Sequence, residues 1–369
     1  MMKIKILFEH LVAICNHVLF SDNRDPSELM LPELSLKEWD KLFSMASLHG
    51  LLPTVMSLFE KRTIENLELR NAIISWFGNA QIDVYNYRMR ISTMRELAEL
   101  FDKDGIDVMF FKGAALAQLY PVEEWRVFSD IDFYLYGKWQ EGNRVLERHG
   151  IECRPYVHHN TEAVLNSILL ENHYDFLERM NHKQNLVLDD EMKRLAEKEG
   201  HSIRADFLGE DVKNAYMMTP TMNAIFLMRH MATHFVSETI PLRMLYDWAL
   251  FLKHHAKDVD WELVVRLYEK SGMTEFVGII QGLIAEHLAI NIQVPVQPLT
   301  GEDTDRIWHS IVNPPIQNPY LKYSLKYYLF EVKMFWSNRW KHKIVYPTES
   351  FTLLFMKYVW LNSKVMLGK

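Results

Sequence analysis

The residue types that could do chemistry gather in one short stretch of the sequence. Asp130 and Asp132 flank Ile131 in the run DIDFYL, whose β-branched and aromatic residues are typical of a β-strand. Because side chains alternate along a strand, both carboxylates project from one face, about 7 Å apart, and repel each other unless cations neutralise them. Two Mg²⁺ ions about 3.5–4 Å apart would do so and would also serve an in-line phosphoryl or nucleotidyl transfer. We interpret the aspartates as a candidate two-metal site.

A phosphate-binding turn is predicted just upstream of the aspartates. An apolar run over 106–111, typical of a buried strand, ends at Lys112-Gly113-Ala114, and a short helix is expected over 114–119. Glycine lets a ligand approach the backbone closely, and the free amide groups that open a helix favour an anion. The turn could therefore meet a phosphate group beside the carboxylates.

The order of these features resembles that of the DNA polymerase β-like nucleotidyltransferase superfamily. Lys112-Gly113, Arg126 and the run from Ser129 to Asp132 are similar to its uncharacterised bacterial nucleotidyltransferase family, in which Lys-Gly takes the usual Gly-Ser place. The resemblance implies an α+β fold, with a small mixed sheet and helices as the nucleotidyltransferase core, flanked by N- and C-terminal helical regions.

The same resemblance implies an activity and its ligands. The expected reaction is Mg²⁺-dependent transfer of a nucleoside monophosphate from a nucleoside triphosphate, with ATP the foremost donor, to a hydroxyl acceptor. Asp130 and Asp132 would hold two Mg²⁺ ions. The residues expected to hold the triphosphate are Lys112, Gly113, Ala114, Arg126 and Ser129.

The sequence departs from the superfamily pattern at two points. Ala114 stands where a serine often follows the glycine, so a hydroxyl contact to phosphate is missing. Fifteen residues separate Ala114 from Asp130, so the loop before the aspartates is expected to be enlarged. The missing serine favours an alternative: a catalytically degenerate nucleotide-binding or interaction module with the same fold.

A third carboxylate is expected on a neighbouring strand. In the run ILLENHYDF, Glu171, His173 and Asp175 would share one face of a strand. Glu171-x-His173 resembles the Glu-x-His that the family places there, which implies that Glu171 is the third metal ligand and that His173 lies in the active site. A shift of register would give the carboxylate role to Asp175, and a solvent-facing strand of ordinary polar residues is the other alternative.

Two histidines, His230 and His234, lie at i and i+4 on a helix predicted over 222–235. Zinc is not favoured, because the glutamate of the metalloprotease motif His-Glu-x-x-His is absent. The related family resembles this stretch as well, with Arg243 and Asp247 following, which implies that these four residues, together with His173, line the acceptor side of the cleft. The alternative is structural, with satisfied histidines and an i, i+4 ion pair between Arg243 and Asp247.

The pattern along the 369-residue chain predicts three regions: a helical region over 1–104, the nucleotidyltransferase core over 105–216 and a helical domain over 217–369. In the first, Ser35 and Glu38 form a capping-box pattern. Apolar periodicity predicts one long helix, or two nearly continuous ones, over 63–103.

The composition argues against a disulfide-stabilised protein, a signal peptide and a membrane-spanning protein. Two cysteines give no disulfide framework, and the apolar amino terminus is interrupted by Glu9 and His10, so it is interpreted as an amphipathic helix and not as a signal peptide. No uninterrupted apolar run reaches the length of a membrane span. We expect a cytoplasmic bacterial protein.

The charge is unevenly distributed. The formal net charge is −7, yet residues 319–369 carry nine Lys or Arg against two Asp or Glu, an excess of +7 that leaves −14 for the rest. This aromatic-rich tail is predicted to be an amphipathic helix with its aromatics in the core. The alternatives are binding to a membrane surface or to nucleic acid, the latter in an RNA-modifying nucleotidyltransferase. The acceptor could equally be a protein hydroxyl, a sugar or a small antibiotic-like molecule.

Overall fold

The computed structural model describes residues 2–21, 29–60, 62–155, 159–179, 182–292, 294–315, 318–321 and 324–366. The chain begins with three helices, α1 (Met2–Phe20), α2 (Leu36–Leu48) and α3 (Leu52–Ser57). The capping box before α2 is present as predicted, because the Glu38 carboxylate accepts hydrogen bonds from the Ser35 backbone N–H at 2.9 Å and from its hydroxyl at 2.6 Å.

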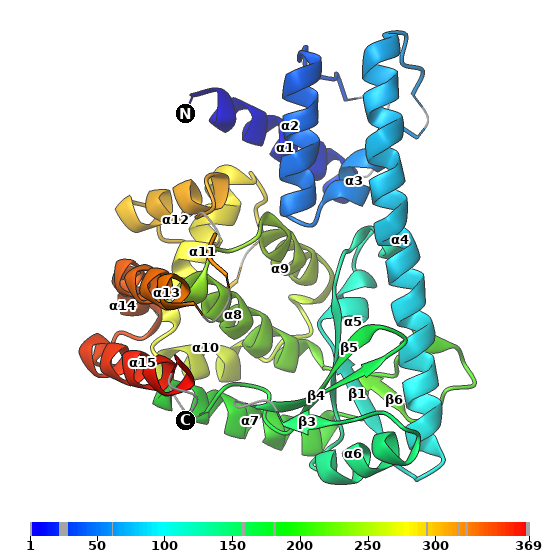
Figure 1. The fold of residues 1–369 in the computed structure, drawn as a ribbon, viewed down its shortest axis with the longest axis vertical. Coiled ribbons are helices and arrows are strands. Elements are labelled where there is room, and N and C mark those ends of the chain that lie inside the picture. The colour runs from blue at the N-terminus through cyan, green and yellow to red at the C-terminus, as the bar shows by residue number, and fades with distance from the viewer. Residues whose placement is uncertain are drawn as a thin grey trace.

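Helix α4 (Leu67–Asp102) is a single element of 36 residues, so the prediction of one long helix is confirmed. Its N-terminus is capped by the Asn66 side chain, which accepts from the Leu69 N–H at 2.9 Å. At 1.5 Å per residue the helix is about 54 Å long. It runs along one side of the molecule from the N-terminal helices to the sheet (Figure 1).

One six-stranded sheet forms the centre of the α/β part, with strand order β3-β4-β5-β2-β1-β6. The strands are β1 (Val108–Phe111), β2 (Asp130–Tyr134), β3 (Arg154–Pro155), β4 (Asn160–Leu165), β5 (Ile168–His173) and β6 (Ala215–Met217). The pairs β2–β5 and β1–β6 are parallel, and the other neighbours are antiparallel. This mixed sheet confirms the predicted α+β class. The sequence also predicts a strand over 151–157; β3 occupies Arg154–Pro155 of this segment, and residues 156–158 lie outside the described residues.

The strands present different side chains to the two sides of the sheet. Phe133 packs toward α4, where its ring centroid lies 5.7 Å from that of Phe101. Tyr134 points to the opposite side and packs on Phe176 at 4.4 Å. Because residues two apart share a face, Asp132 lies on the side of Tyr134 and therefore faces α8 rather than α4.

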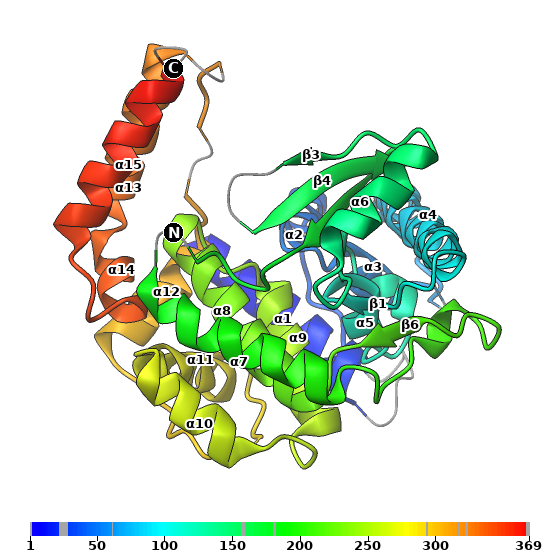
Figure 2. The same ribbon diagram turned by 90° about the horizontal axis from the view of Figure 1, so that it is seen from below.

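Short helices connect the strands: α5 (Gly113–Ala117), α6 (Trp139–Arg148) and α7 (Lys183–Glu199), with 3₁₀ turns at Glu123–Trp125 and Asp206–Leu208. The rest of the chain is helical, with α8 (Pro220–Ser237), α9 (Leu242–His255), α10 (Trp261–Lys270), α11 (Thr274–His287), α12 (Glu302–Val312), α13 (Leu325–Ser337), α14 (Arg339–Val345) and α15 (Phe351–Met366). The two views show these helices gathered beside the sheet (Figures 1 and 2).

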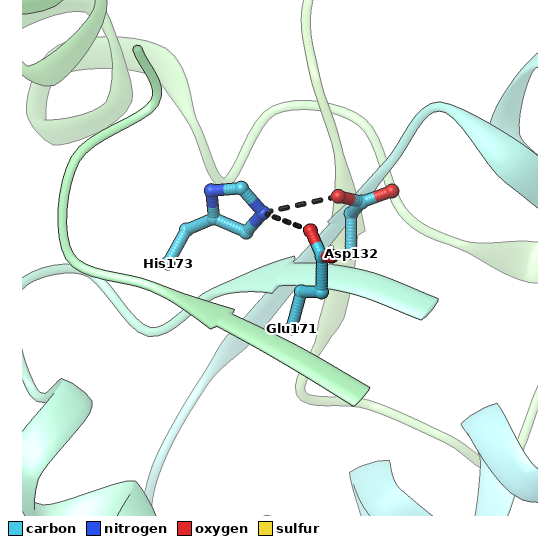
Figure 3. Close-up of side chains that lie close together, drawn as sticks. All are labelled: Asp132, Glu171 and His173. Carbon is cyan, nitrogen blue, oxygen red and sulfur yellow. Dashed lines mark hydrogen bonds and ion pairs between the residues drawn. The ribbon is translucent and has the colours of Figure 1, made fainter. Parts of the chain in front are cut away.

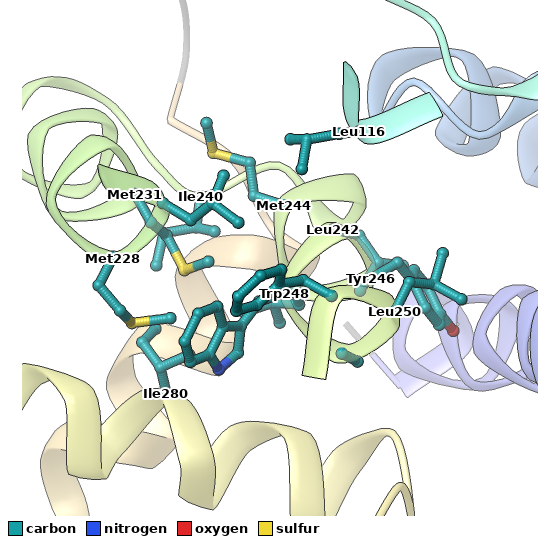
Figure 4. Packing of buried hydrophobic residues seen from close by; sticks show 14 of the residues in the cluster. Leu116, Met228, Met231, Ile240, Leu242, Met244, Tyr246, Trp248, Leu250 and Ile280 are labelled. Atoms are coloured by element: carbon teal, nitrogen blue, oxygen red, sulfur yellow. The ribbon is translucent and has the colours of Figure 1, made fainter. Parts of the chain in front are cut away.

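The largest hydrophobic core lies among these helices. Figure 4 shows Met228, Trp248 and Ile280 of α8, α9 and α11 packed together, with Leu116 of α5 nearby. The N-terminal helices belong to the same core, since Phe8 of α1 meets the ring of Trp308 in α12 at 5.4 Å. Across the described residues, no helix is long and apolar enough to cross a lipid bilayer.

The basic tail folds into the helices α13, α14 and α15. Phe335 stacks on Tyr358 at 4.2 Å, which joins α13 to α15. Tyr328 and Tyr346 are buried, as the amphipathic pattern predicts, whereas Trp336 keeps 47% of its surface exposed.

Candidate functional site

The register of two parallel strands places Asp132 beside Glu171. In the β2–β5 pair, Asp132 lies opposite Glu171 and Tyr134 lies opposite His173. His173 Nε2 is 3.0 Å from Asp132 Oδ1 and 3.4 Å from Glu171 Oε2 (Figure 3). One ligand atom from each of Asp132, Glu171 and His173 lies within 4.8 Å of the other two. Glu171 and His173, which follow Asp132 by 39 and 41 positions in the sequence, thus lie in one cluster with it.

Asp175, the alternative carboxylate, lies elsewhere. Strand β5 ends at His173, and the Asp175 side chain forms an ion pair with Lys193 of α7. The third carboxylate beside the strand aspartates is therefore Glu171.

Asp130 stands at the start of β2, in the wall of the adjoining cavity and outside the three-residue cluster. Burial, together with the neighbouring Asp132 carboxylate, raises the pKa of Asp130 above its ordinary value. The Ser129 hydroxyl donates to Asp130 Oδ1 at 3.3 Å.

Lys112 is the cation already present among the carboxylates. Its ammonium donates to Asp132 Oδ1 at 2.6 Å, and its side chain is only 16% exposed. The backbone of Lys112 has φ 55 and ψ −130, a left-handed conformation that L side chains rarely adopt. Backbone strain of this kind persists where the surrounding structure enforces it, commonly at ligand sites.

Lys112 and His173 together set the charge of Asp132. Burial opposes ionisation of Asp132, but the Lys112 ammonium and the His173 hydrogen bond outweigh it and hold the pKa of Asp132 well below its usual range. Burial also disfavours a charged His173, yet hydrogen bonds to Asp132 and Glu171 raise the pKa of His173. Asp132 is therefore a carboxylate at neutral pH.

A cavity of about 350 Å³ adjoins the cluster. Lys112, Gly113, Ser129 and Asp130 line it from the strand side, whereas Ala114 is buried behind the turn. The opposite walls come from three helices: Asp83, Asn86 and Arg90 of α4, His230 and His234 of α8, and Arg243 and Asp247 of α9. The structure thus brings part of the predicted strand set, Lys112, Gly113, Ser129 and Asp130, to one cavity with the predicted C-terminal residues. Asp132, Glu171 and His173 form the adjoining cluster and do not line this cavity.

Arg126 is held in the cavity wall by a buried ion pair. Its Nε and one terminal nitrogen donate to the two Asp247 oxygens at 2.9 Å each, and its other terminal nitrogen donates to the Gly113 carbonyl at 2.9 Å. Tyr120 donates to the same Asp247 carboxylate at 2.8 Å. Asp247 is therefore bound to Arg126 and not to Arg243, which donates to the Val127 carbonyl instead.

His230 and His234 form a ring pair with centroids 4.7 Å apart. Burial, reinforced by the nearby Lys112 ammonium, holds the pKa of His230 well below its usual value. The same two causes lower the pKa of His234 to about 4. Both imidazoles are neutral at physiological pH and offer one hydrogen-bond donor and one acceptor each.

A family model described as an uncharacterised nucleotidyltransferase matches residues 35–289, more than half of the chain. The chain belongs to this family. No curated protein and no solved structure matches it. The family assignment confirms the resemblance that the strand residues carry. The match also covers α8 and α9, so the helices that form the far wall of the cavity are part of this nucleotidyltransferase family's common sequence.

Sequence reasoning missed the α4 wall of this nucleotidyltransferase. Asp83, Asn86 and Arg90 are polar at i, i+3 and i+7, on a helix whose neighbouring residues Val84 and Tyr87 are buried. That polar row was the available signal. It was overlooked because apolar periodicity alone had been used to define the helix.

Proposed function

We propose that this chain transfers a nucleoside monophosphate from a nucleoside triphosphate, with ATP the favoured donor, to a hydroxyl acceptor in an Mg²⁺-dependent reaction. The observation that carries the proposal is the placement of Asp132 opposite Glu171 on neighbouring strands. This pair adjoins a cavity that Lys112, Gly113 and Asp130 line. The nucleotidyltransferase family supports the reaction class.

The donor atoms fit a hard divalent cation. Carboxylate oxygens of Asp132 and Glu171 lie close together with the His173 nitrogen, and Asp130 adds a carboxylate at the edge of the cavity. We assign Asp130, Asp132 and Glu171 as the residues that would hold the two Mg²⁺ ions. When bound, Mg²⁺ would lower the pKa of the acceptor hydroxyl and neutralise charge on the phosphate oxygens.

Residues of the chain would supply the proton transfer, the binding of the triphosphate and the positioning of the Gly113 turn. Glu171 orients the acceptor hydroxyl and takes its proton as the new oxygen–phosphorus bond forms and the bond from the α-phosphorus to the bridging oxygen breaks. Lys112 and the Gly113–Ala114 backbone bind the triphosphate, and Ser129 contributes a hydroxyl. Arg126 fixes the Gly113 carbonyl through its hydrogen bond, so its contribution is to hold the turn in position.

The acceptor side is formed by helices outside the strands. We propose that the helical regions 1–104 and 217–369 close over the core 105–216 and that His230, His234, Arg243 and Asp247 line the acceptor half of the cavity. Neutral histidines suit this place because they can hydrogen-bond a hydroxyl without adding charge.

The test is calorimetric titration of ATP, GTP, CTP and UTP with and without Mg²⁺, together with transfer of label from an α-labelled nucleotide. Wild type is compared with Asp130→Asn/Asp132→Asn, and Asp175→Asn serves as a matched control because its carboxylate lies outside the cavity. We expect Mg²⁺-dependent nucleotide binding that the double variant loses and the control keeps. Binding without Mg²⁺ and without turnover would identify the degenerate module instead.

One observation favours RNA as the acceptor class to test first. Both carboxylates of the tail are engaged within the fold, Glu331 by Asn318 at 2.7 Å and Glu349 by His182 at 2.8 Å, whereas Lys326, Lys333 and Lys343 are exposed. An RNA acceptor predicts binding that falls steeply with salt and weakens when these lysines are replaced by glutamine. Binding that is insensitive to salt would exclude it.

A further inference from the structure

Helix α4 carries a row of uncharged residues, most of which stay exposed and belong to neither hydrophobic core among the described residues. Leu67, Ile74, Ile82 and Tyr85 keep 67%, 60%, 58% and 61% of their surface exposed. At 100° per residue they lie on one narrow face of the helix. The apolar periodicity of α4 predicts that Ile74 packs on the core, but Ile74 is exposed and its neighbour Ile73 is buried.

Gly78 lies at the middle of this face. A Cβ at Gly78 would meet no atom of the described residues within 4 Å, so nothing in the fold requires glycine there. Glycine destabilises a helix interior relative to alanine because it has more conformational freedom to lose. Its benefit at an exposed position is close approach of another backbone.

The row is symmetric about Gly78. Ile74 and Ile82 lie four residues to either side of it, Asn71 and Tyr85 lie seven, and Leu67 and Met89 lie eleven. Met89 is only partly exposed and packs on the core beside the sheet, so the exposed part of the row ends at Tyr85. A second α4 that runs antiparallel, related by a twofold axis at Gly78, would bring each residue level with its counterpart. Ile74 of one copy would lie level with Ile82 of the other, so the same patch would serve both partners, as an isologous interface requires.

Charge also favours a second copy as the occupant. The chain carries a net charge of −7, so two copies repel each other unless their contact surfaces are neutral. The seven residues of the row, Leu67, Asn71, Ile74, Gly78, Ile82, Tyr85 and Met89, include no Asp, Glu, Lys or Arg. A basic or acidic partner would find no complementary charge on this face.

We propose that the protein forms a twofold symmetric dimer in which two α4 helices pack antiparallel through this row, with Gly78 at the axis. The inference does not depend on the proposed chemistry. It has a consequence for the cavity, because Asp83, Asn86 and Arg90 lie on an adjacent face of the same helix. In the dimer, α4, which carries this wall of the cavity, would be held against the α4 helix of the second copy.

The first test is the oligomeric state, measured by sedimentation velocity over a range of concentrations. Wild type should sediment as a dimer. Ile74→Glu and Ile82→Glu should each raise the dimer dissociation constant by about a hundredfold or more, because carboxylates would be buried without partners at the interface. Leu353→Glu, at a residue 64% exposed on α15, is the matched control and should leave the dimer intact.

The second test is the geometry of pairing, by disulfide cross-linking in a Cys153→Ser background; Cys15, the remaining cysteine, is buried. Gly78→Cys should cross-link to itself across the axis. Asn71→Cys should not cross-link to itself but should do so when mixed with Tyr85→Cys. Wild type that remains monomeric at all concentrations would overturn the proposal, as would dissociation by Leu353→Glu alone or self-cross-linking of Asn71→Cys, which indicates parallel helices.

Discussion

Arg126 and Asp247, which are 121 residues apart, are joined by two hydrogen bonds of 2.9 Å, and both side chains are almost fully buried. The pair connects the loop before β2 to α9. Because Tyr120 also donates to Asp247 and Arg126 also donates to Gly113, this one contact joins the start of α5, the α5–β2 loop and α9.

The first prediction follows from this pair. Asp247→Asn leaves the Arg126 guanidinium buried without its counter-charge, so we expect it to lower the free energy of unfolding by about 3–5 kcal/mol. Arg126→Met/Asp247→Leu removes both charges and should recover most of that loss. The measurement is urea unfolding followed by circular dichroism. Equal destabilisation in the single and double variants would show that the ion pair is not the cause.

The second prediction separates Glu171 from Asp175. If Glu171 is the proposed base, Glu171→Gln should lower the nucleotidyl-transfer rate by about a hundredfold or more, because the carboxylate that we propose takes the acceptor proton is removed. Asp175→Asn, a change of the same kind on a residue that pairs with Lys193, should leave the rate unchanged. The measurement is the steady-state transfer rate of each variant with α-labelled ATP. A rate lost in Asp175→Asn and kept in Glu171→Gln would assign the catalytic carboxylate to Asp175, in the loop after β5.

The third prediction concerns Lys112, whose ammonium lies 2.6 Å from Asp132 Oδ1. Lys112→Met keeps most of the side-chain length but removes the charge. We expect Mn²⁺ alone to bind at least about tenfold more tightly, since a competing cation has gone, and ATP in the presence of Mg²⁺ to bind more weakly, since a phosphate contact has gone. Electron paramagnetic resonance of Mn²⁺ and calorimetry of ATP measure the two effects. If the affinities for Mn²⁺ and for ATP both rose or both fell, Lys112 would not both compete with the metal ion and bind phosphate.

The fourth prediction is a pH dependence of stability. His49 is buried, its Nδ1 accepts from the Leu242 N–H at 3.0 Å, and burial lowers the pKa of His49 to about 4. The unfolded chain takes up this proton near pH 6.5 and the folded chain only near pH 4, so the stabilisation is complete above pH 6.5 and is lost as the pH falls toward 4. The loss amounts to about 3 kcal/mol.

His49→Asn tests this interpretation, because the asparagine oxygen can still accept from Leu242 but does not titrate. Melting temperatures between pH 7 and pH 4 should fall less steeply in this variant than in wild type, although its stability at pH 7 is lower. His149→Asn, at an exposed position, should keep the wild-type slope. An unchanged slope in His49→Asn would assign the acid sensitivity to other groups.

Local pattern was enough to predict most helices and the strand that carries the aspartates. Alternation along DIDFYL predicted that Asp130 and Asp132 share one face, and the Glu-x-His resemblance predicted that Glu171 lies beside these aspartates, which the register with Asp132 confirms. Strand β4 was not predicted, because Asn160–Leu165 mixes polar and apolar residues and becomes a strand only by pairing with β5.

Contacts between segments that are distant in the sequence could not be predicted from local pattern. An i, i+4 spacing suggests that Asp247 pairs with Arg243, but the guanidinium that reaches it comes from Arg126, on a loop whose path no local rule fixes. The Lys112–Asp132 contact depends on a positive φ at a lysine, which sequence statistics disfavour. Local propensity thus locates elements, whereas tertiary packing selects the partners of charged groups.

The shared core of the first and last helices has a consequence for synthesis on the ribosome. Phe8 of α1 packs on Trp308 of α12, and Asn16 donates to the Leu288 carbonyl at 2.7 Å. At translation rates of about 5–20 residues per second, α1 therefore waits on the order of tens of seconds before its partners emerge. Through that interval the apolar face of α1 is open to chaperones and to neighbouring nascent chains, and it is covered only after Leu288 and Trp308 have been synthesised.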